Sequence, residues 1–103
     1  MRILGVDPGT LVTGFGLIEA QGSRLIHLGH GTVRTSSRTC LAERLAAIYE
    51  ELCRVVREFP PDALAVEKVF VAANVVSAMK LCHARGIALL AGAQHRIPVY
   101  EYS

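Results

Sequence analysis

Two carboxylates, Asp7 and Glu67, are the residues of this sequence whose spacing best suits chemistry, because each ends a short apolar run. A strand with a carboxylate at its carboxyl end places that charge at the rim of a sheet, where α/β proteins bind ligands. Neighbouring carboxylates repel each other unless a cation or a shared proton relieves them, and oxygen ligands suit hard ions such as Mg²⁺ or Mn²⁺. The pair is a candidate metal site for phosphodiester hydrolysis; capping a strand end or pairing with an arginine is the alternative.

The tight turn that follows Asp7 offers a second kind of chemistry. Its residues Pro8, Gly9 and Thr10 reverse the chain, and backbone N–H groups in such a turn can cradle a phosphate. The turn is not a Walker A loop, because no Gly-Lys-Ser or Gly-Lys-Thr follows it. A phosphate contact at this turn therefore stays open beside the metal hypothesis.

The histidines do not predict a metal site. His27 and His30 lie in one expected strand, where residues three apart point to opposite faces. His83 and His95 lie in or at the end of an expected helix without a matched partner, so we expect them on the surface or in packing roles.

Composition indicates one globular domain over residues 1–103. Hydrophobic residues make up 51%, and we expect no apolar run to be long enough for a bilayer, and hence no membrane association. The three cysteines form no C-x-x-C pair, which argues against a zinc ribbon or a disulfide framework. The net charge of +2 is too small to indicate nucleic-acid binding by itself. No signal peptide is visible, so the expected location is cytoplasmic.

The apolar pattern predicts an α/β domain with the element order β-β-β-α-β-α-β. The helix between the third and fourth strands allows a right-handed crossover, which sets the fourth strand parallel to the first. If those strands are neighbours, Asp7 and Glu67 end at the same rim. The expected strands are residues 2–7, 12–19, 24–34, 62–67 and 99–102, and the expected helices are residues 41–58 and 75–95.

The two expected helices differ in kind. Apolar residues of the first recur at steps of three and four, which is typical of a helix with one buried face. The latter half of the second, residues 86–93, is apolar all round and rich in small residues. We expect such a helix to pack tightly against the sheet or against a second subunit.

The stretches RILGVDPGTLVTGFG and AVEKVFVAANVVSAMKLCHARG resemble the RuvC family of Holliday junction resolvases, and the final HRIPVYEYS fits the same family. The resemblance runs over nearly the whole chain. It implies a ribonuclease-H-like fold with a mixed five-stranded sheet and flanking helices. It also implies a homodimer that makes paired, Mg²⁺-dependent nicks in four-way DNA junctions during recombination and repair, in cooperation with a branch-migration complex.

The resemblance also implies roles for individual residues. Asp7 and Glu67 take the places of two metal-binding catalytic carboxylates, and Phe70 that of an aromatic side chain near the junction crossover. The helix after Asn74 would serve the dimer interface and approach the DNA. The residues expected to contact DNA are Gly9, Thr10, Thr13, Phe70, Asn74, Ser77, Lys80 and Arg85.

Several positions depart from the family pattern. Leu11 stands where a basic residue is usual, Ala73 where an arginine is common, and Cys82-His83 in place of a Gly-Gln pair. Family members continue beyond the position of Ser103 and carry further acidic metal ligands there. We therefore expect a C-terminally truncated nuclease domain that cuts poorly or not at all by itself, because two carboxylates hold a metal ion weakly.

Two other classes of protein fit parts of the pattern. A nucleotide-phosphate-binding domain of the actin, Hsp70 and sugar-kinase class also opens with a strand, an Asp-x-Gly turn and a hairpin. It would need a longer chain to clamp a nucleotide, and it leaves Glu67 and Phe70 without a role. A non-catalytic DNA-binding module would keep the fold but not the metal site.

Overall fold

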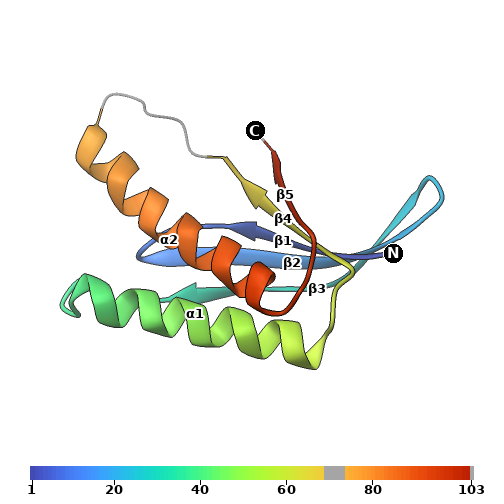
Figure 1. Cartoon of the computed structure of the whole chain (residues 1–103), viewed down its shortest axis with the longest axis horizontal. Helices are drawn as coiled ribbons and strands as arrows, with labels where there is room; N and C mark the ends of the chain where they lie inside the picture. The colour runs from blue at the N-terminus through green and yellow to red at the C-terminus, as the bar shows by residue number, and fades with distance from the viewer. Residues whose placement is uncertain (69–73, 103) are drawn as a thin grey trace.

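Five strands form one mixed sheet in the order β3-β2-β1-β4-β5 (Figure 1). The computed structural model describes residues 1–68 and 74–102. The predicted element order is confirmed, and the predicted boundaries agree with the observed ones to within two residues. The strands are β1 (Arg2–Asp7), β2 (Val12–Gln21), β3 (Arg24–Arg34), β4 (Ala63–Glu67) and β5 (Val99–Tyr102), and the helices are α1 (Leu41–Glu58) and α2 (Val75–Gln94).

Strand β1 lies at the centre of the sheet and pairs differently on its two sides. It runs antiparallel to β2, as expected for strands joined by a tight turn, and parallel to β4. The parallel pairing needs a crossover, and α1 supplies it, which confirms the predicted topology. At the start of this pairing the backbone N–H of Arg2 donates to Oδ2 of Asp62 at 2.8 Å, and so fixes where β4 begins.

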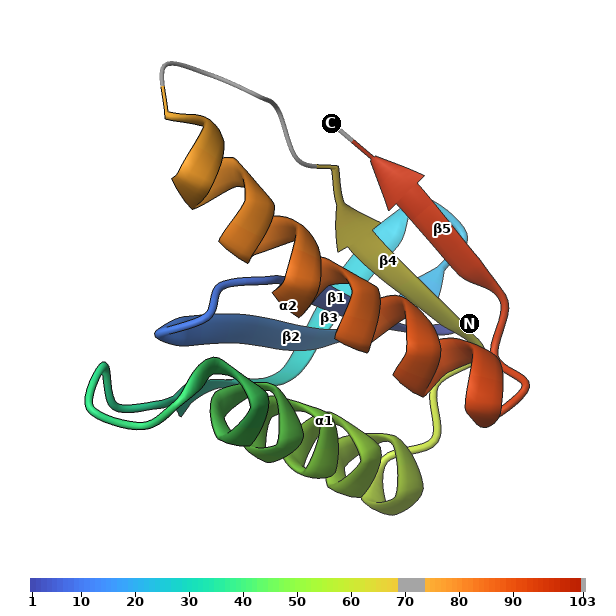
Figure 2. The same ribbon diagram turned by 60° about the vertical axis from the view of Figure 1, so that its left-hand side comes forward.

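Both helices cover the same face of the sheet (Figure 2). Because side chains alternate along a strand, Leu4 and Val6 of β1 point toward the helices and are fully buried, as is Val66 of β4. Together with Leu17, Ile48, Leu52 and Leu64 they form the apolar core. We call the opposite side the open face, since no described element packs on it (Figures 1 and 2). The intervening residues of each strand, such as Gly5 and Asp7, belong to this face.

Helix α2 packs on the sheet through small residues. A Cβ atom at Gly92 would lie 2.6 Å from Cγ2 of Val99 and 2.8 Å from Cδ2 of Leu64, so any larger residue would have to displace these side chains. Ala84, Ala88 and Ala91 are buried on the same helix. The predicted tight packing of the latter half of this helix on the sheet is therefore confirmed.

The other end of α2 is apolar but exposed. Val75, Val76 and Met79 each leave more than half of their surface accessible. By length and composition alone α2 is apolar enough to cross a membrane, with a mean hydropathy of 1.3 over its best window. The expectation that no apolar run reaches that length is therefore wrong. Its buried small residues nevertheless give it the contacts of a helix that packs on a sheet.

A β-bulge interrupts the pairing of β2 with β3. Leu17 pairs with Gly29 and Ile18 pairs with His27, so Leu28 is an extra residue in β3. The extra residue turns His27 and His30 to the same side, and Nε2 of His27 lies 3.0 Å from Nδ1 of His30. The prediction that these two side chains point to opposite faces is wrong, because it assumed an uninterrupted alternation.

Candidate metal centre

Asp7 and Glu67 lie side by side at one edge of the sheet. Val6 pairs with Val66 in the parallel β1–β4 ladder, so the next residue of each strand is a carboxylate at the same edge and on the open face. Both residues are exposed. Within residues 1–68 and 74–102, neither carboxylate forms an ion pair or a side-chain hydrogen bond. The pattern therefore fits a cation site better than a strand cap or an arginine partner.

Tyr102 is a third side chain at this edge, and the sequence analysis missed it. Strand β5 runs parallel to β4, and Tyr102 pairs with Glu67. Burial, followed by the negative charges of Glu67 and Asp7, raises the pKa of the Tyr102 phenol above its usual value. The phenol thus stays neutral beside both carboxylates. Tyr102 is the last residue of a strand that runs parallel to β4, and this position could have identified it as a site residue from the sequence.

Glycine leaves space beside the first carboxylate. Gly14 of β2 is the register partner of Asp7, and a Cβ atom at Gly14 would lie 4.0 Å from Cβ of Asp7. With no side chain there, the open face next to Asp7 has room for an ion and its water ligands. Two unpaired carboxylates and open space suit a hard, oxygen-preferring divalent cation. The described ranges contain no group of three or more His, Cys, Asp or Glu side chains that could hold a metal ion.

The turn after Asp7 is held by two hydrogen bonds of a buried threonine. Thr13 is fully buried, and its hydroxyl donates to the Gly9 carbonyl at 2.6 Å and accepts from the Gly9 N–H at 3.1 Å. A Cβ atom at Gly9 would lie 2.2 Å from the Val12 carbonyl oxygen, so the turn requires glycine. Thr13 is one of the predicted DNA contacts, and its side chain, which has no exposed surface, serves in this structure to hold the turn. The Gly9 N–H is likewise engaged within the turn and not directed at a phosphate.

The remaining predicted DNA contacts lie in different surroundings. Asn74 is the N-cap of α2, and its side-chain oxygen accepts from the Ser77 N–H at 3.1 Å. Ser77 and Lys80, in the first turns of the same helix, are exposed. The guanidinium of Arg85 instead forms an ion pair with Glu101 of β5, and a DNA contact at Arg85 stays a prediction. Phe70 and the departure at Ala73 lie outside the described residues.

A basic residue that the sequence analysis did not single out ends β3 at the same end of the sheet as the carboxylates. Arg34 pairs with Val12 at the start of β2 and is exposed. Its neighbour Val33 is buried toward the helices, so Arg34 belongs to the open face. Thr35 follows it, and its hydroxyl donates to the carbonyl of Thr10, which holds the end of β3 against the turn. The register of the hairpin was the signal that could have placed Arg34 at this edge.

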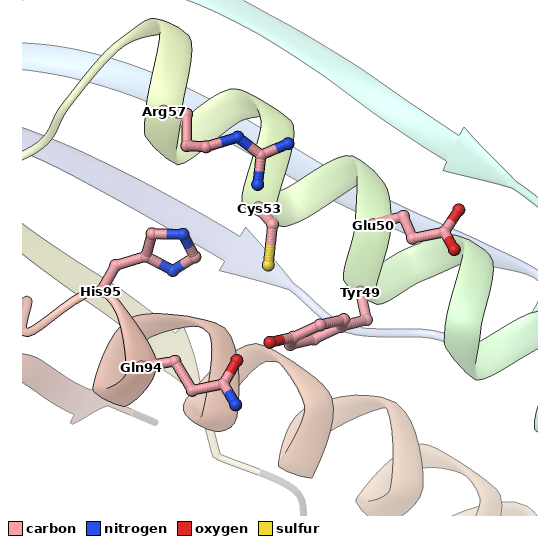
Figure 3. Close-up of a pocket in the computed structure, with 6 residues that line it drawn as sticks. All are labelled: Tyr49, Glu50, Cys53, Arg57, Gln94 and His95. Carbon is pink, nitrogen blue, oxygen red and sulfur yellow. The ribbon is translucent and has the colours of Figure 1, made fainter.

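A hollow of about 530 Å³ lies between α1 and the C-terminal end of α2 (Figure 3). It sits in the helical layer, on the other side of the sheet from the carboxylates. Its lining residues are Tyr49, Glu50, Cys53, Arg57, Gln94 and His95. None of them belongs to the predicted metal centre, so the hollow does not extend that site.

The sheet order, the crossover and the carboxylates at the ends of the central parallel strands define a ribonuclease-H-like α/β fold. Within this class, a family model described as crossover junction endodeoxyribonuclease RuvC matches residues 3–103, and the chain belongs to the RuvC family. The fold class and the family resemblance predicted from the sequence are both confirmed.

Individual relatives give the same result. RuvC of Syntrophotalea carbinolica is 52% identical over 103 residues, which are 100% of this chain and 64% of that protein. RuvC of Geobacter sulfurreducens is also 52% identical, and the match covers 100% of this chain and 63% of that protein. The structure of Thermus thermophilus RuvC in complex with a Holliday junction substrate matches with a TM-score of 0.92 at 31% identity, over 99% of this chain and 65% of that one. The chain thus spans less than two thirds of the length of these relatives.

Proposed function

We propose that this chain is the catalytic core of a structure-specific endonuclease that resolves four-way DNA junctions by paired, metal-dependent hydrolysis in recombination and repair. One observation carries the proposal: Asp7 and Glu67 end adjacent parallel strands on the open face, without a protein partner among the described residues. The match to a RuvC bound to a Holliday junction substrate supports the choice of DNA.

The chemistry we propose is hydrolysis of a phosphodiester at the carboxylate edge. RuvC nucleases depend on metal ions, and we propose Mg²⁺ here, with Mn²⁺ as a substitute, because the donors are carboxylate oxygens. Such an ion activates a water molecule and stabilises the leaving oxygen. Asp7 and Glu67 would hold it, and the neutral phenol of Tyr102 would donate a hydrogen bond to an oxygen at the same edge.

The proposed DNA surface surrounds this edge. Arg34 offers a positive charge on the β3 side, and Lys80 and Ser77 offer a charge and a hydroxyl at the exposed start of α2. Charges of this kind contribute sequence-independent attraction to phosphates. Thr10, whose carbonyl is held by Thr35, stays a proposed contact at the turn. The stacking role of Phe70 stays a prediction.

We propose that the chain acts as a homodimer. Two symmetric nicks in one junction need two active sites, and a two-fold dimer supplies them. The exposed apolar end of α2 supports this, because it carries a hollow of about 230 Å³ with almost wholly apolar walls. That hollow is lined by Val75, Ala78, Met79, Cys82 and His83. Cooperation with a branch-migration complex and a cytoplasmic location, where chromosomal DNA lies in bacteria, belong to the same proposal.

A gel experiment tests the proposal. The chain is mixed with a labelled four-way junction or with a linear duplex of the same sequence, in Mg²⁺ or in chelator. We expect selective binding of the junction that is stronger in Mg²⁺, and weak cutting, because two carboxylates alone hold Mg²⁺ poorly. Any nicks should be paired across the junction and absent in Glu67→Gln.

Three results would contradict the proposal. Equal affinity for junction and duplex would remove the structure-specific function. Junction binding indifferent both to Mg²⁺ and to Asp7→Asn would instead indicate a DNA-binding module without a metal site. Stabilisation of the chain by ATP in a thermal shift assay would favour the nucleotide-binding class.

A further inference from the structure

The bulge in β3 creates a histidine pair that has no part in the proposed nuclease site. His27 pairs with Ile18 and His30 pairs with Gly16, and both partners belong to the open face of β2. Their rings lie 5.1 Å apart between centroids, and both residues are exposed. Strand β3 is an edge strand, so among the described residues no strand pairs on its outer side, next to the two imidazoles.

The spacing of the two nitrogens matches that of two adjacent ligands of one metal ion. Nε2 of His27 and Nδ1 of His30 lie 3.0 Å apart. With metal–nitrogen bonds of about 2.1 Å, two nitrogens at that spacing subtend about 90° at the ion. This is the angle between neighbouring ligands in octahedral or square-planar coordination, the geometries of Ni²⁺ and Cu²⁺. A tetrahedral Zn²⁺ ion would need a spacing of about 3.4 Å.

We propose that His27 and His30 form a binding site for one divalent transition-metal ion, Ni²⁺ or Cu²⁺, distinct from the oxygen site at Asp7 and Glu67. In the absence of an ion the same two nitrogens share a hydrogen bond. Binding requires each neutral ring to carry its proton on its other nitrogen, Nδ1 of His27 and Nε2 of His30, and both exposed rings to turn so that the two lone pairs converge on the ion instead of on each other. Water fills the remaining coordination positions, since both side chains are open to solvent.

Ligand chemistry keeps the two sites apart. Imidazole nitrogens suit Cu²⁺ and Ni²⁺, whereas carboxylate oxygens suit Mg²⁺. Millimolar Mg²⁺ should therefore compete for the carboxylates but not for the histidine pair. This makes the inference independent of the nuclease proposal: the histidine site stands even if the chain binds no DNA.

The test is calorimetric titration of Ni²⁺ into the chain in buffer containing millimolar Mg²⁺. We expect one ion per chain, and His27→Asn and His30→Asn should each weaken binding at least about tenfold, because a single imidazole loses the chelate. The matched controls are His83→Asn and Cys82→Ser, which remove an imidazole and an exposed thiol on α2. Both controls should leave the affinity unchanged.

A second measurement does not depend on the variants. In the unsubstituted chain, Ni²⁺ should broaden the imidazole proton signals of His27 and His30 at ratios below one ion per chain, and leave those of His83 and His95 sharp. The proposal is overturned if the affinity is the same in both β3 variants, or if Cys82→Ser or His83→Asn abolishes binding. Broadening of the α2 histidines first would also overturn it.

Discussion

The two faces of the sheet are built from the same strands and differ in almost every property. On the helix-covered face, Leu4, Val6 and Val66 are fully buried, and the side chains interlock with those of the helices. One residue further along each strand, the open face carries glycines, carboxylates and histidines together with the partly buried Ile3 and Ile18, and none of its large apolar side chains is fully buried. Alternation lets a five-residue strand such as β4 contribute to the core and to the chemistry at once. Stability and function are therefore separable by a shift of one position.

The largest expected effect on stability comes from removing a side chain at the centre of the core. Leu4→Ala removes a fully buried side chain and should lower the free energy of unfolding by about 2–5 kcal/mol. Ile3→Ala, one residue away on the open face and only partly buried, should cost clearly less. Urea unfolding followed by circular dichroism measures both. Equal losses would mean that something covers the open face in solution.

A smaller loss is expected where α2 meets the sheet. Gly92→Ala forces a methyl group against Leu64 and Val99, and should destabilise the fold by about 1–3 kcal/mol. Gly86→Ala is the matched control on the same helix, because apart from its chain neighbours and its own helix backbone no atom lies within 4 Å of its added Cβ. It should raise stability by up to about 1 kcal/mol through helix propensity. Thermal melts of the two variants should therefore shift in opposite directions.

Thr13→Val tests whether the hydrogen bonds of the buried Thr13 hydroxyl hold the turn that positions Asp7. The substitution keeps the shape but removes the hydroxyl that joins both backbone groups of Gly9, and should cost roughly 1–2 kcal/mol. Because the turn directly follows Asp7, Mg²⁺ affinity should fall as well. Thr32→Val, at an exposed position of β3, is the control and should change neither quantity. Loss of stability with unchanged Mg²⁺ affinity would show that the turn does not position Asp7.

The smallest effect on stability is expected at the metal centre itself. Asp7→Asn removes one of two neighbouring negative charges, so the unfolding free energy should stay within about 0.5 kcal/mol or rise slightly, while Mg²⁺ binding is lost. Asp62→Asn is the informative comparison, because that carboxylate accepts from the Arg2 N–H at the other end of the β1–β4 pairing. It should lower stability and leave Mg²⁺ binding intact. Mg²⁺ titrations and urea unfolding of both variants measure the two quantities.

The sequence predicted the elements, because an apolar run that ends in a carboxylate locates a strand end. It predicted that Asp7 and Glu67 meet only on the condition that the first and fourth strands are neighbours, and the observed pairing of β1 with β4 meets that condition. The bulge at Leu28 could not be predicted in this way, because a period of two contains no information on where pairing slips. It changed the relation between His27 and His30 from opposite to adjacent.

Other misses have a related cause. The ion pair of Arg85 with Glu101 depends on a contact between side chains from different elements. Residue type gives the polarity of an arginine but not the partner that the fold provides. Tyr102 was missed because its significance depends on its register with Glu67 and not on its own sequence context.

The parallel pairing of β1 with β4 also bears on the order in which the molecule folds. The bond from Arg2 to Asp62 joins residues 60 positions apart, whereas the β2–β3 hairpin closes over a few residues. Contacts of long sequence separation form late, because the loop between them must lose its entropy first. In a refolding experiment, hairpin structure should appear before the chain can bind Mg²⁺. A ligand that binds only the completed edge then stabilises the whole fold and not one part of it.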